Sequence, residues 1–438
     1  MPGFSLWVYG LVMRLAQPLL RRKLHKRAQA EPLYEQHIEE RFGRYKQSAS
    51  QDWIWIHAVS LGETRTAAVL LQGLRKALPS MKLLLTNGTA TGREEGRKLL
   101  QDGDIQVWQP WDSPEAVDRF LSAFKPKIGL LLETEVWPQL IHAAQAKGIP
   151  IMLINARMSQ KSMRQAQRWR SLMQPAFAGL SAVCAQAPED AVRLKNLGAP
   201  VQGVFGNLKF DAEPDASQVA LGHSWREKMK APVVMFASSR EGEESLWLAA
   251  WLKFTKQHPE VQINWLIVPR HPQRLSDVEK LLQSSGLQVS RRSTWGQQGP
   301  VLESHLQEGA QEESIVFLGD SLGEMALYYS LSHTALLGGS FEKLGGQNLI
   351  EAAACACPVV MGPHTFNFAE ASQAAEAAGA AQRATDMHEA VHMALETARS
   401  QPLQKQKSAN AMQFAQQHGG AMQRTVLAVL AQLNSDLD

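Results

Sequence analysis

The residues best suited to chemistry in the first half of the chain are polar side chains that directly follow short apolar runs. Glu63 comes four residues after the apolar run Trp53–Val59, and Glu133 and Glu135 end a later run. A carboxylate in such a place can act as a general base toward a hydroxyl group. Ser60 stands three residues before Glu63, which is the pattern of a capping box. Helix capping and catalysis are therefore both open for Glu63.

The second half carries residues suited to holding an anion. Arg270 and His271 follow an apolar run, and their guanidinium and imidazole groups suit an anionic oxygen. The segments Ala237–Glu244 and Gly345–Glu351 each indicate a small-residue turn that opens a helix, where backbone N–H groups can hold phosphate. In the second segment, Glu351 can accept hydrogen bonds from ribose hydroxyls. A solvated glutamate after a glycine-rich turn is the structural alternative.

Parallel strands have to position these side chains, because short apolar runs alternate with longer amphipathic stretches from Trp53 onward. The first series of expected strands comprises Trp53–Val59, Lys82–Thr86, Ile105–Gln109, Ile128–Glu133, Ile149–Ile154, Ala182–Cys184 and Val201–Phe205. The second series comprises Val233–Ala237, Asn264–Val268, Ser314–Leu318, Ala335–Gly338 and Pro358–Met361. The pattern predicts two doubly wound α/β halves, in which ligands bind beyond the carboxyl ends of the strands.

Three segments fall outside this alternation. Small and polar residues over Asp211–Ser217 indicate a linker between the halves. The polar stretch Ser284–Glu313 suggests one strand and surface loops, and the chain from Asp386 to Leu433 has the pattern of helices.

The N-terminus predicts a membrane-anchoring helix. Residues Phe4–Leu20 are mostly apolar, and a basic cluster follows at once, comprising Arg21, Arg22, Lys23, Lys26 and Arg27. A cleavable signal peptide would place its positive charges before the apolar run. The run is short for a membrane span and contains Arg14, so a helix lying in the membrane interface is as compatible with it as a crossing helix. An amphipathic helix packed on its own domain is the third possibility.

Composition narrows the class of protein. A chain of 438 residues is expected to form two domains, and a net charge of only +3 gives no global basic field for nucleic acid. The three cysteines fit neither a disulfide framework nor a zinc site, and the histidines show no zinc-ligand spacing. Asp102-Gly103-Asp104 matches a metal motif formally, but it precedes a strand and is typical of a turn. His57 lies within a strand and is expected to be a satisfied core histidine.

Taken in order, these segments resemble the 3-deoxy-D-manno-octulosonic acid (Kdo) transferases of Gram-negative lipopolysaccharide assembly. The resemblance covers nearly the whole chain and rests on Glu40–Gly43, Trp55–Glu63, Glu133–Pro138, Asn155–Arg157, Gly206–Asp211, Pro269–Pro272, Gly319–Glu324 and Gly345–Glu351. It implies the GT-B fold, with two Rossmann-like domains facing a central cleft. The expected division is an anchoring basic helix over residues 1–30, an acceptor domain over 31–212 and a CMP-sugar domain over 213–438, the last helices being free to pack back on the acceptor domain.

The resemblance implies an inverting transfer of Kdo from CMP-Kdo to the glucosamine 6′-hydroxyl of a lipid A precursor (lipid IVA), without a metal or other cofactor. Glu63 would be the general base, and Glu133 and Lys209 would stabilise the transition state. The residues expected to line the nucleotide site are Arg270, His271, Leu322, Gly323, Glu324, Asn348, Leu349, Ile350 and Glu351. The expected location is the cytoplasmic face of the bacterial inner membrane, on its anionic surface.

Two positions depart from the family pattern. The family usually has histidine where this chain has Gln347, and commonly histidine where it has Arg240. Gln347 keeps hydrogen bonding but has no titratable ring, and Arg240 adds positive charge near the expected donor site.

Two other functions remain open on this reasoning. The first is a different GT-B transferase or a nucleotide-sugar epimerase, which would not need the basic N-terminal segment. The second is a non-catalytic protein of the same fold that binds anionic lipid.

Overall fold

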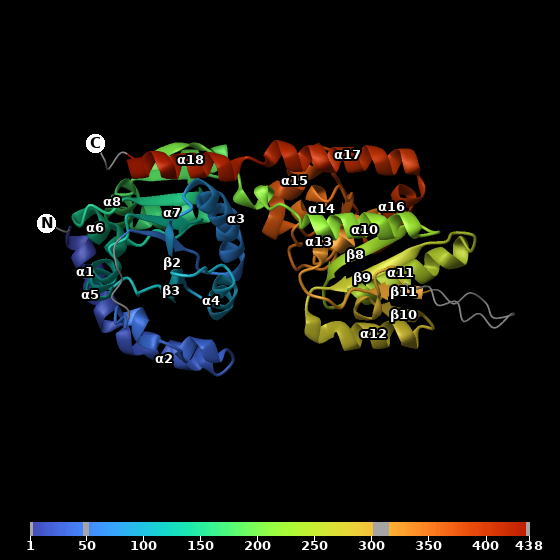
Figure 1. The fold of residues 1–438 in the computed structure, drawn as a ribbon, viewed down its shortest axis with the longest axis horizontal. Coiled ribbons are helices and arrows are strands. Elements are labelled where there is room, and N and C mark those ends of the chain that lie inside the picture. Colours follow the sequence, from blue (N-terminus) through green and yellow to red (C-terminus); the bar gives the residue numbers. More distant parts are fainter. Residues whose placement is uncertain (1–2, 47–51, 301–314, 435–438) are drawn as a thin grey trace. The chain divides into compact units, whose positions relative to one another are not determined.

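The computed structural model describes residues 3–46, 52–300 and 315–434. The chain forms two compact units, and each has its own sheet and core (Figure 1). Unit 1 comprises Met1–Asp211 together with Gly419–Asp438, and unit 2 comprises Ala212–His418. The chain therefore leaves unit 1 at the segment expected as a linker and returns to it for its last helix.

The sheet of unit 1 has seven parallel strands, in the order β3-β2-β1-β4-β5-β6-β7. The strands are β1 (Trp53–His57), β2 (Lys82–Asn87), β3 (Ile105–Trp108), β4 (Ile128–Leu132), β5 (Ile151–Ala156), β6 (Ala182–Ala185) and β7 (Val201–Val204). The strand order reverses between β1 and β4, so this pair forms the topological switch point where such sheets bind ligands.

Helices cover both faces of this sheet. They are α3 (Leu61–Ala77), α4 (Ala90–Arg97), α5 (Pro114–Phe124), α6 (Pro138–Ala146), α7 (Gln160–Arg168), α8 (Arg170–Ala178), α9 (Pro188–Asn196) and α18 (Ala421–Asn434). Alternate residues of β1 point to opposite faces. Trp55 accordingly packs in the core beneath α5, whereas Ile54 packs in the core beneath α3 and α18. Burial on both faces explains why the strands are continuous apolar runs.

The N-terminal segment contains two helices where the sequence predicted one. These are α1 (Phe4–Leu15) and α2 (Gln17–Ala28), followed by the short helices η1 (Pro32–Glu35) and η2 (Ile38–Phe42). Pro18 lies in the first turn of α2 and has no N–H to donate to the carbonyl of Arg14, which interrupts the helical hydrogen bonds. Among the described residues, none of the helices combines the length and apolar character that crossing a membrane requires.

Unit 2 repeats the doubly wound arrangement with a second sheet of seven parallel strands, in the order β10-β11-β9-β8-β12-β13-β14. Its strands are β8 (Val233–Ser239), β9 (Asn264–Pro269), β10 (Gln288–Arg291), β11 (Ile315–Leu318), β12 (Thr334–Leu337), β13 (Val359–Met361) and β14 (Ala381–Arg383). The prediction of two parallel α/β halves is confirmed. The sequence did not predict β14, and Ser314 with the rest of 301–314 lies outside the described residues.

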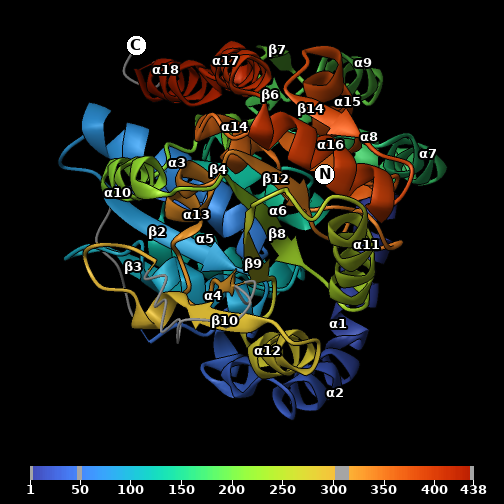
Figure 2. The ribbon, with the colours of Figure 1, turned by 90° about the vertical axis from the view of Figure 1, so that its right-hand side faces the viewer.

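The helices of unit 2 also cover both faces of their sheet. They are α10 (Ala216–Lys228), α11 (Glu243–Gln257), α12 (Leu275–Ser284), α13 (Met325–Leu331), α14 (Ile350–Ala354), α15 (Ala369–Ala377), α16 (Met387–Arg399) and α17 (Gln401–His418), with the short helices η3 (Leu208–Asp211) at the end of unit 1 and η4 (Pro272–Arg274), η5 (Arg292–Thr294) and η6 (Phe366–Phe368) in unit 2. Figure 2 shows α10 and α11 on opposite sides of β8 and β9.

Candidate functional site

Glu63 lies at the start of α3, directly beyond the carboxyl end of β1. Its Oε1 accepts a hydrogen bond from the Ser60 hydroxyl (2.9 Å), and its Oε2 accepts one from the Val59 N–H (2.8 Å). The Glu63 N–H in turn lies 3.4 Å from Ser60 Oγ. The capping box is therefore formed, and it fixes the carboxylate in one orientation at the edge of the sheet.

Glu133 follows β4, the neighbour of β1, in a strained backbone conformation. Its φ is 57°, and Asn155 at the end of the adjacent β5 has φ 50°. Both angles lie in the left-handed region, which residues other than glycine rarely adopt. The Glu133 N–H donates to the Ile154 carbonyl (3.0 Å), and the Arg157 N–H donates to the Glu133 carbonyl (3.2 Å). Strain held in place by such bonds clusters at functional sites.

Lys209 lies in η3, the short helix at the end of the first chain segment of unit 1, and its side chain contacts Glu133. Its Nζ lies 3.3 Å from Glu133 Oε1. Helix η3, which carries Lys209, is fixed by the Leu208 N–H donating to Asn155 Oδ1 (3.0 Å) and by Asp211 accepting from the Met422 N–H of α18 (2.7 Å). The structure thus brings together two of the residues selected from sequence, although they are 76 positions apart.

Several carboxylates share this edge of the sheet, and their pKa values reflect it. Burial raises the pKa of Glu63, hydrogen bonds from Val59 and Ser60 oppose that rise, and the charge of Glu133 adds to it. Burial and then the charge of Glu63 raise the pKa of Glu135 to about 7. A carboxylate with a raised pKa is a stronger general base, so Glu63 is suited to accept a proton from a hydroxyl group.

The sequence placed Glu135 at this edge of the sheet but did not select it as a catalytic residue, and the structure shows that it lies among these groups. Its Oε2 accepts from the Trp137 indole N–H (3.0 Å) and lies 4.0 Å from His57 Nε2. His57 is fully buried, as expected of a core histidine, but only one of its ring nitrogens is hydrogen-bonded within the described residues. The pattern Glu-Thr-Glu gave no signal that distinguished the second carboxylate from the first.

In unit 2, the predicted nucleotide residues lie at the carboxyl ends of several strands. Arg270 is exposed beyond β9, and His271 precedes η4. Leu322 is 79% exposed beyond β11, and Gly323 beside it has φ 80°. Glu324 accepts from Arg292 Nη2 (2.9 Å) and from the Ser321 hydroxyl, which holds this loop in place.

The segment Asn348–Glu351 lies between β12 and β13. Asn348 Oδ1 accepts from the Ile350 N–H (3.1 Å), whereas Leu349 and Ile350 are only 1% and 2% exposed and pack in the interior. Burial raises the pKa of Tyr329, and the charges of Glu351 and Arg270 act on it in opposite directions. Arg270 and Glu351 therefore lie near the same buried ring, although they are distant in sequence.

Gln347 and Arg240, the two departures from the family pattern, both lie beside Gly339. A Cβ added to Gly339 would lie 3.1 Å from Gln347 Nε2 and 3.6 Å from Arg240 Cγ. The side chains at both positions therefore lie next to the glycine turn after β12.

Glu243 accepts hydrogen bonds from several backbone N–H groups, and one of them belongs to a segment that the sequence predicted to hold phosphate. Its carboxylate is fully buried and accepts from the N–H groups of Arg240 (2.9 Å), Gly339 (2.7 Å) and Phe341 (3.0 Å). The turn after β8 and the turn after β12 are therefore joined by a side chain of this protein. The Arg240 N–H, in the segment Ala237–Glu244, is not left for a ligand.

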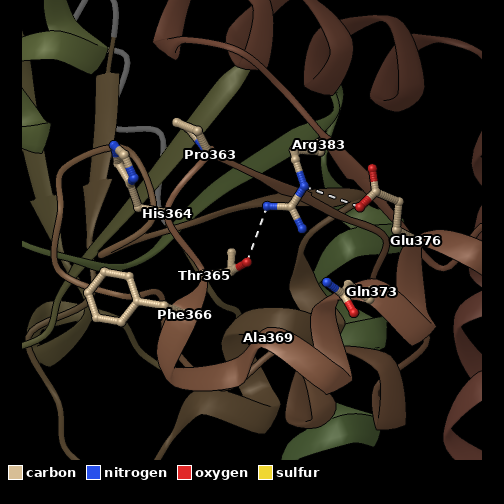
Figure 3. Close-up of a pocket in the computed structure, with 8 residues that line it drawn as sticks. All are labelled: Pro363, His364, Thr365, Phe366, Ala369, Gln373, Glu376 and Arg383. Atoms are coloured by element: carbon tan, nitrogen blue, oxygen red, sulfur yellow. Dashed lines mark hydrogen bonds and ion pairs between the residues drawn. The ribbon is translucent and has the colours of Figure 1, made fainter.

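A cavity of about 400 Å³ lies in unit 2 (Figure 3). Gly345 and Gly346 lie close to its lining residues Phe366 and Thr365. Its lining residues are Pro363, His364, Thr365, Phe366, Ala369, Gln373, Glu376 and Arg383. Figure 3 shows Arg383 between Thr365 and Glu376, and its guanidinium donates to both (3.2 Å each). The Asn367 N–H donates to the Gly345 carbonyl (2.9 Å), which ties this cavity to the segment that includes Asn348.

The residues discounted from sequence have structural roles. Asp104 accepts from the N–H groups of Gln101 and Leu83 (2.8 and 2.9 Å) and from Arg75, so it organises a turn. Cys184, Cys355 and Cys357 are buried free thiols. Within residues 3–46, 52–300 and 315–434, no three or more His, Cys, Asp or Glu residues are grouped so as to hold a metal ion.

Comparison with solved structures agrees with the fold. A UDP-GlcNAc 2-epimerase from Neisseria meningitidis is 16% identical, with a TM-score of 0.54 over 87% of this chain and 100% of its own. MurG from Acinetobacter baumannii is 15% identical, with a TM-score of 0.54 over 87% of this chain and 99% of its own. At this identity the likeness concerns the fold alone, which is GT-B.

Comparison of sequences identifies the family. Residues 36–212 match the family model described as 3-deoxy-D-manno-octulosonic-acid transferase (kdotransferase). A 3-deoxy-D-manno-octulosonic acid transferase of Bordetella pertussis is 42% identical over 96% of this chain and 98% of its own length. The resemblance inferred from the strand-end segments is thereby confirmed. The chain belongs to the Kdo transferase family and is a glycosyltransferase of the GT-B fold.

Proposed function

We propose that this enzyme transfers Kdo from CMP-Kdo to the glucosamine 6′-hydroxyl of lipid IVA or a related lipid A precursor, in lipopolysaccharide inner-core biosynthesis. The observation that carries the proposal is the 42% identity to a Kdo transferase over 96% of the chain. The group of carboxylates at the switch point of unit 1 supports it, because transfer to a sugar hydroxyl needs a base.

In the proposed step, Glu63 accepts the proton of the acceptor hydroxyl group. The oxygen of that hydroxyl group attacks the anomeric carbon of Kdo. A new carbon–oxygen bond forms on the face opposite the phosphate, so the configuration at the anomeric carbon inverts. The bond from the anomeric carbon to CMP breaks, and CMP leaves with the bonding electron pair. The capping hydrogen bonds from Val59 and Ser60 hold the Glu63 carboxylate in place for this step.

Basic residues of this chain are proposed to stabilise the negative charge that develops as CMP leaves. Lys209, paired with Glu133, supplies a positive charge beside the carboxylates and is proposed to stabilise the transition state. In unit 2, the CMP site is proposed to consist of Arg270, His271, Leu322–Glu324 and Asn348–Glu351. Arg270 is exposed, as a residue that contacts an anionic ligand should be.

We therefore expect transfer to need no metal ion. Purified enzyme with CMP-Kdo and lipid IVA should form product at the same rate with and without excess EDTA. Mass spectrometry of the lipid measures product formation. UDP-GlcNAc should not replace CMP-Kdo. Complete loss of product in EDTA, restored by Mg²⁺, would overturn the metal-free mechanism. Turnover of UDP-GlcNAc without change in the lipid would instead favour an epimerase on the same fold.

The proposed site of action is the cytoplasmic face of the inner membrane, where helix α1 would lie in the interface. One face of α1 packs on unit 1, since Gly10 is buried and the Leu6 carbonyl accepts from Gln139 Nε2 (2.8 Å). The apolar side chains exposed on α1 and at the start of α2 are Phe4, Trp7, Val8, Leu11, Val12, Leu15 and Leu19. The basic residues that follow on α2 suit anionic headgroups.

The membrane proposal predicts that replacing exposed apolar residues of α1 weakens lipid binding. Trp7→Glu combined with Leu15→Glu should lower co-sedimentation with phosphatidylglycerol–phosphatidylethanolamine vesicles at least about tenfold, because each apolar side chain lost from the interface forfeits roughly 1.5–3 kcal/mol. Val192→Glu is the matched control, since Val192 is an exposed apolar residue on α9. Equal binding by both variants would contradict a role for α1.

A further inference from the structure

His57, the last residue of β1, has one ring nitrogen with a partner and one without. Its Nδ1 lies 2.9 Å from Thr86 Oγ1 and 3.1 Å from the Thr86 carbonyl oxygen. A carbonyl oxygen only accepts, so Nδ1 carries the hydrogen. Burial lowers the pKa of His57 to about 3, so the ring is neutral and Nε2 presents a lone pair. Nε2 is buried and has no hydrogen-bond donor within the described residues.

Glu135 is the ionisable group that faces this lone pair. Its Oε2 lies 4.0 Å from His57 Nε2, about 1 Å longer than a hydrogen bond, and its side chain is only 17% exposed. An ionised Glu135 could only accept, and would leave Nε2 without a donor. A protonated Glu135 has an O–H to donate, and its hydroxyl oxygen can still accept from Trp137.

The charges around Glu135 also favour a proton on it. Glu63 from α3 and Glu133 from the end of β4 both raise its pKa, after burial, to about 7. Lys209 offers a positive charge and is paired with Glu133, the buried Arg41 of η2 acts on His57, and His57 itself is neutral. Three carboxylates close together repel one another less when one of them is protonated.

We propose that Glu135 holds that proton in the resting enzyme and donates it to His57 Nε2, the two side chains closing by about 1 Å to form the hydrogen bond, which leaves Glu63 and Glu133 ionised. The inference rests on the proposed function, since it explains how Glu63 stays ready to act as base. Glu135 acts through Glu63 and His57 and is a positioning residue. When Glu135 loses its proton, it can no longer donate to His57 Nε2, the link between the ends of β1 and β4 beside Glu63 is lost, and transfer slows.

The pH dependence of the Glu135→Gln variant tests this assignment. Glutamine is neutral at every pH, and its amide N–H can donate to His57 Nε2. Wild-type kcat/KM for CMP-Kdo should fall as pH rises through about 7, and should be roughly tenfold lower at pH 8 than at pH 6. Glu135→Gln should stay within about threefold of wild type at pH 6 and show no fall by pH 8. Glu94→Gln, at an exposed carboxylate on α4, should keep the wild-type profile.

An infrared titration separates this inference from the proposed function, because it needs no turnover. Wild-type enzyme should show the carbonyl stretch of a protonated carboxyl group that disappears near pH 7, and Glu135→Gln should lack it. If the signal persists in Glu135→Gln, or if this variant keeps the wild-type fall in kcat/KM, the assignment of the proton to Glu135 is wrong. If the infrared signal behaves as expected but no Kdo transfer occurs, the proposed function fails and the protonation of Glu135 stands.

Discussion

Replacing Glu63 by glutamine is expected to lower kcat for Kdo transfer by about 10²–10⁴-fold while leaving the fold intact. Glutamine fits the third helical position of a capping box as well as glutamate does, and its amide oxygen can accept from the Val59 N–H. It cannot take a proton from a hydroxyl group. Initial rates at saturating CMP-Kdo and lipid IVA, with the melting temperature measured in parallel, would separate lost chemistry from lost structure.

Ser60→Ala is the matched control for this prediction. It removes the capping oxygen, at a cost of about 1 kcal/mol in stability, but leaves the Glu63 carboxylate bonded to the Val59 N–H. Its kcat should therefore stay within several-fold of wild type. A fall as large as that of Glu63→Gln would mean that the local geometry, and not proton transfer, limits the reaction.

Glu243→Ala is expected to destabilise unit 2 by about 3 kcal/mol. Glu243 is fully buried and accepts from the N–H groups of Arg240, Gly339 and Phe341 and, at 3.4 Å, of Glu342, so alanine leaves four donors without this acceptor. Each buried donor left unsatisfied costs about 1–3 kcal/mol, and part of the total is regained because no carboxylate has to be buried.

Hydrogen exchange of the peptide that contains Gly339 and Phe341 measures this effect within unit 2. Glu241→Ala is the control, because the Glu241 side chain is exposed, and an ion pair with an exposed carboxylate typically contributes less than about 1 kcal/mol. If this peptide were equally protected from hydrogen exchange in Glu243→Ala and Glu241→Ala, the buried Glu243 carboxylate would not stabilise the two turns.

The sequence was sufficient to predict two parallel sheets because most of their strands are buried on both faces and therefore appear as continuous apolar runs. The position of Glu63 followed from the same pattern, since a residue just after a parallel strand lies at the carboxyl edge. The strand β14, of three residues, was too short to give such a signal, and the break between α1 and α2 depended on a single proline.

Contacts between residues that are distant in the sequence could not be predicted from the sequence alone. Glu135 and His57 are 78 positions apart, and their proximity depends on β1 and β4 being neighbours in the sheet. The use of backbone amides by Glu243 likewise required the turns after β8 and β12 to lie together. Local patterns predict which residues reach an edge, whereas tertiary packing decides which of them meet.

The most direct test of Glu63 as the base is the single-turnover rate of Kdo transfer in Glu63→Gln and Ser60→Ala, with CMP-Kdo and lipid IVA bound at saturation. Binding differences are then removed, and the rate reports the chemical step. We predict a rate about 10²–10⁴-fold below wild type for Glu63→Gln and within several-fold of wild type for Ser60→Ala. A Glu63→Gln rate close to wild type would contradict the role of Glu63 as general base.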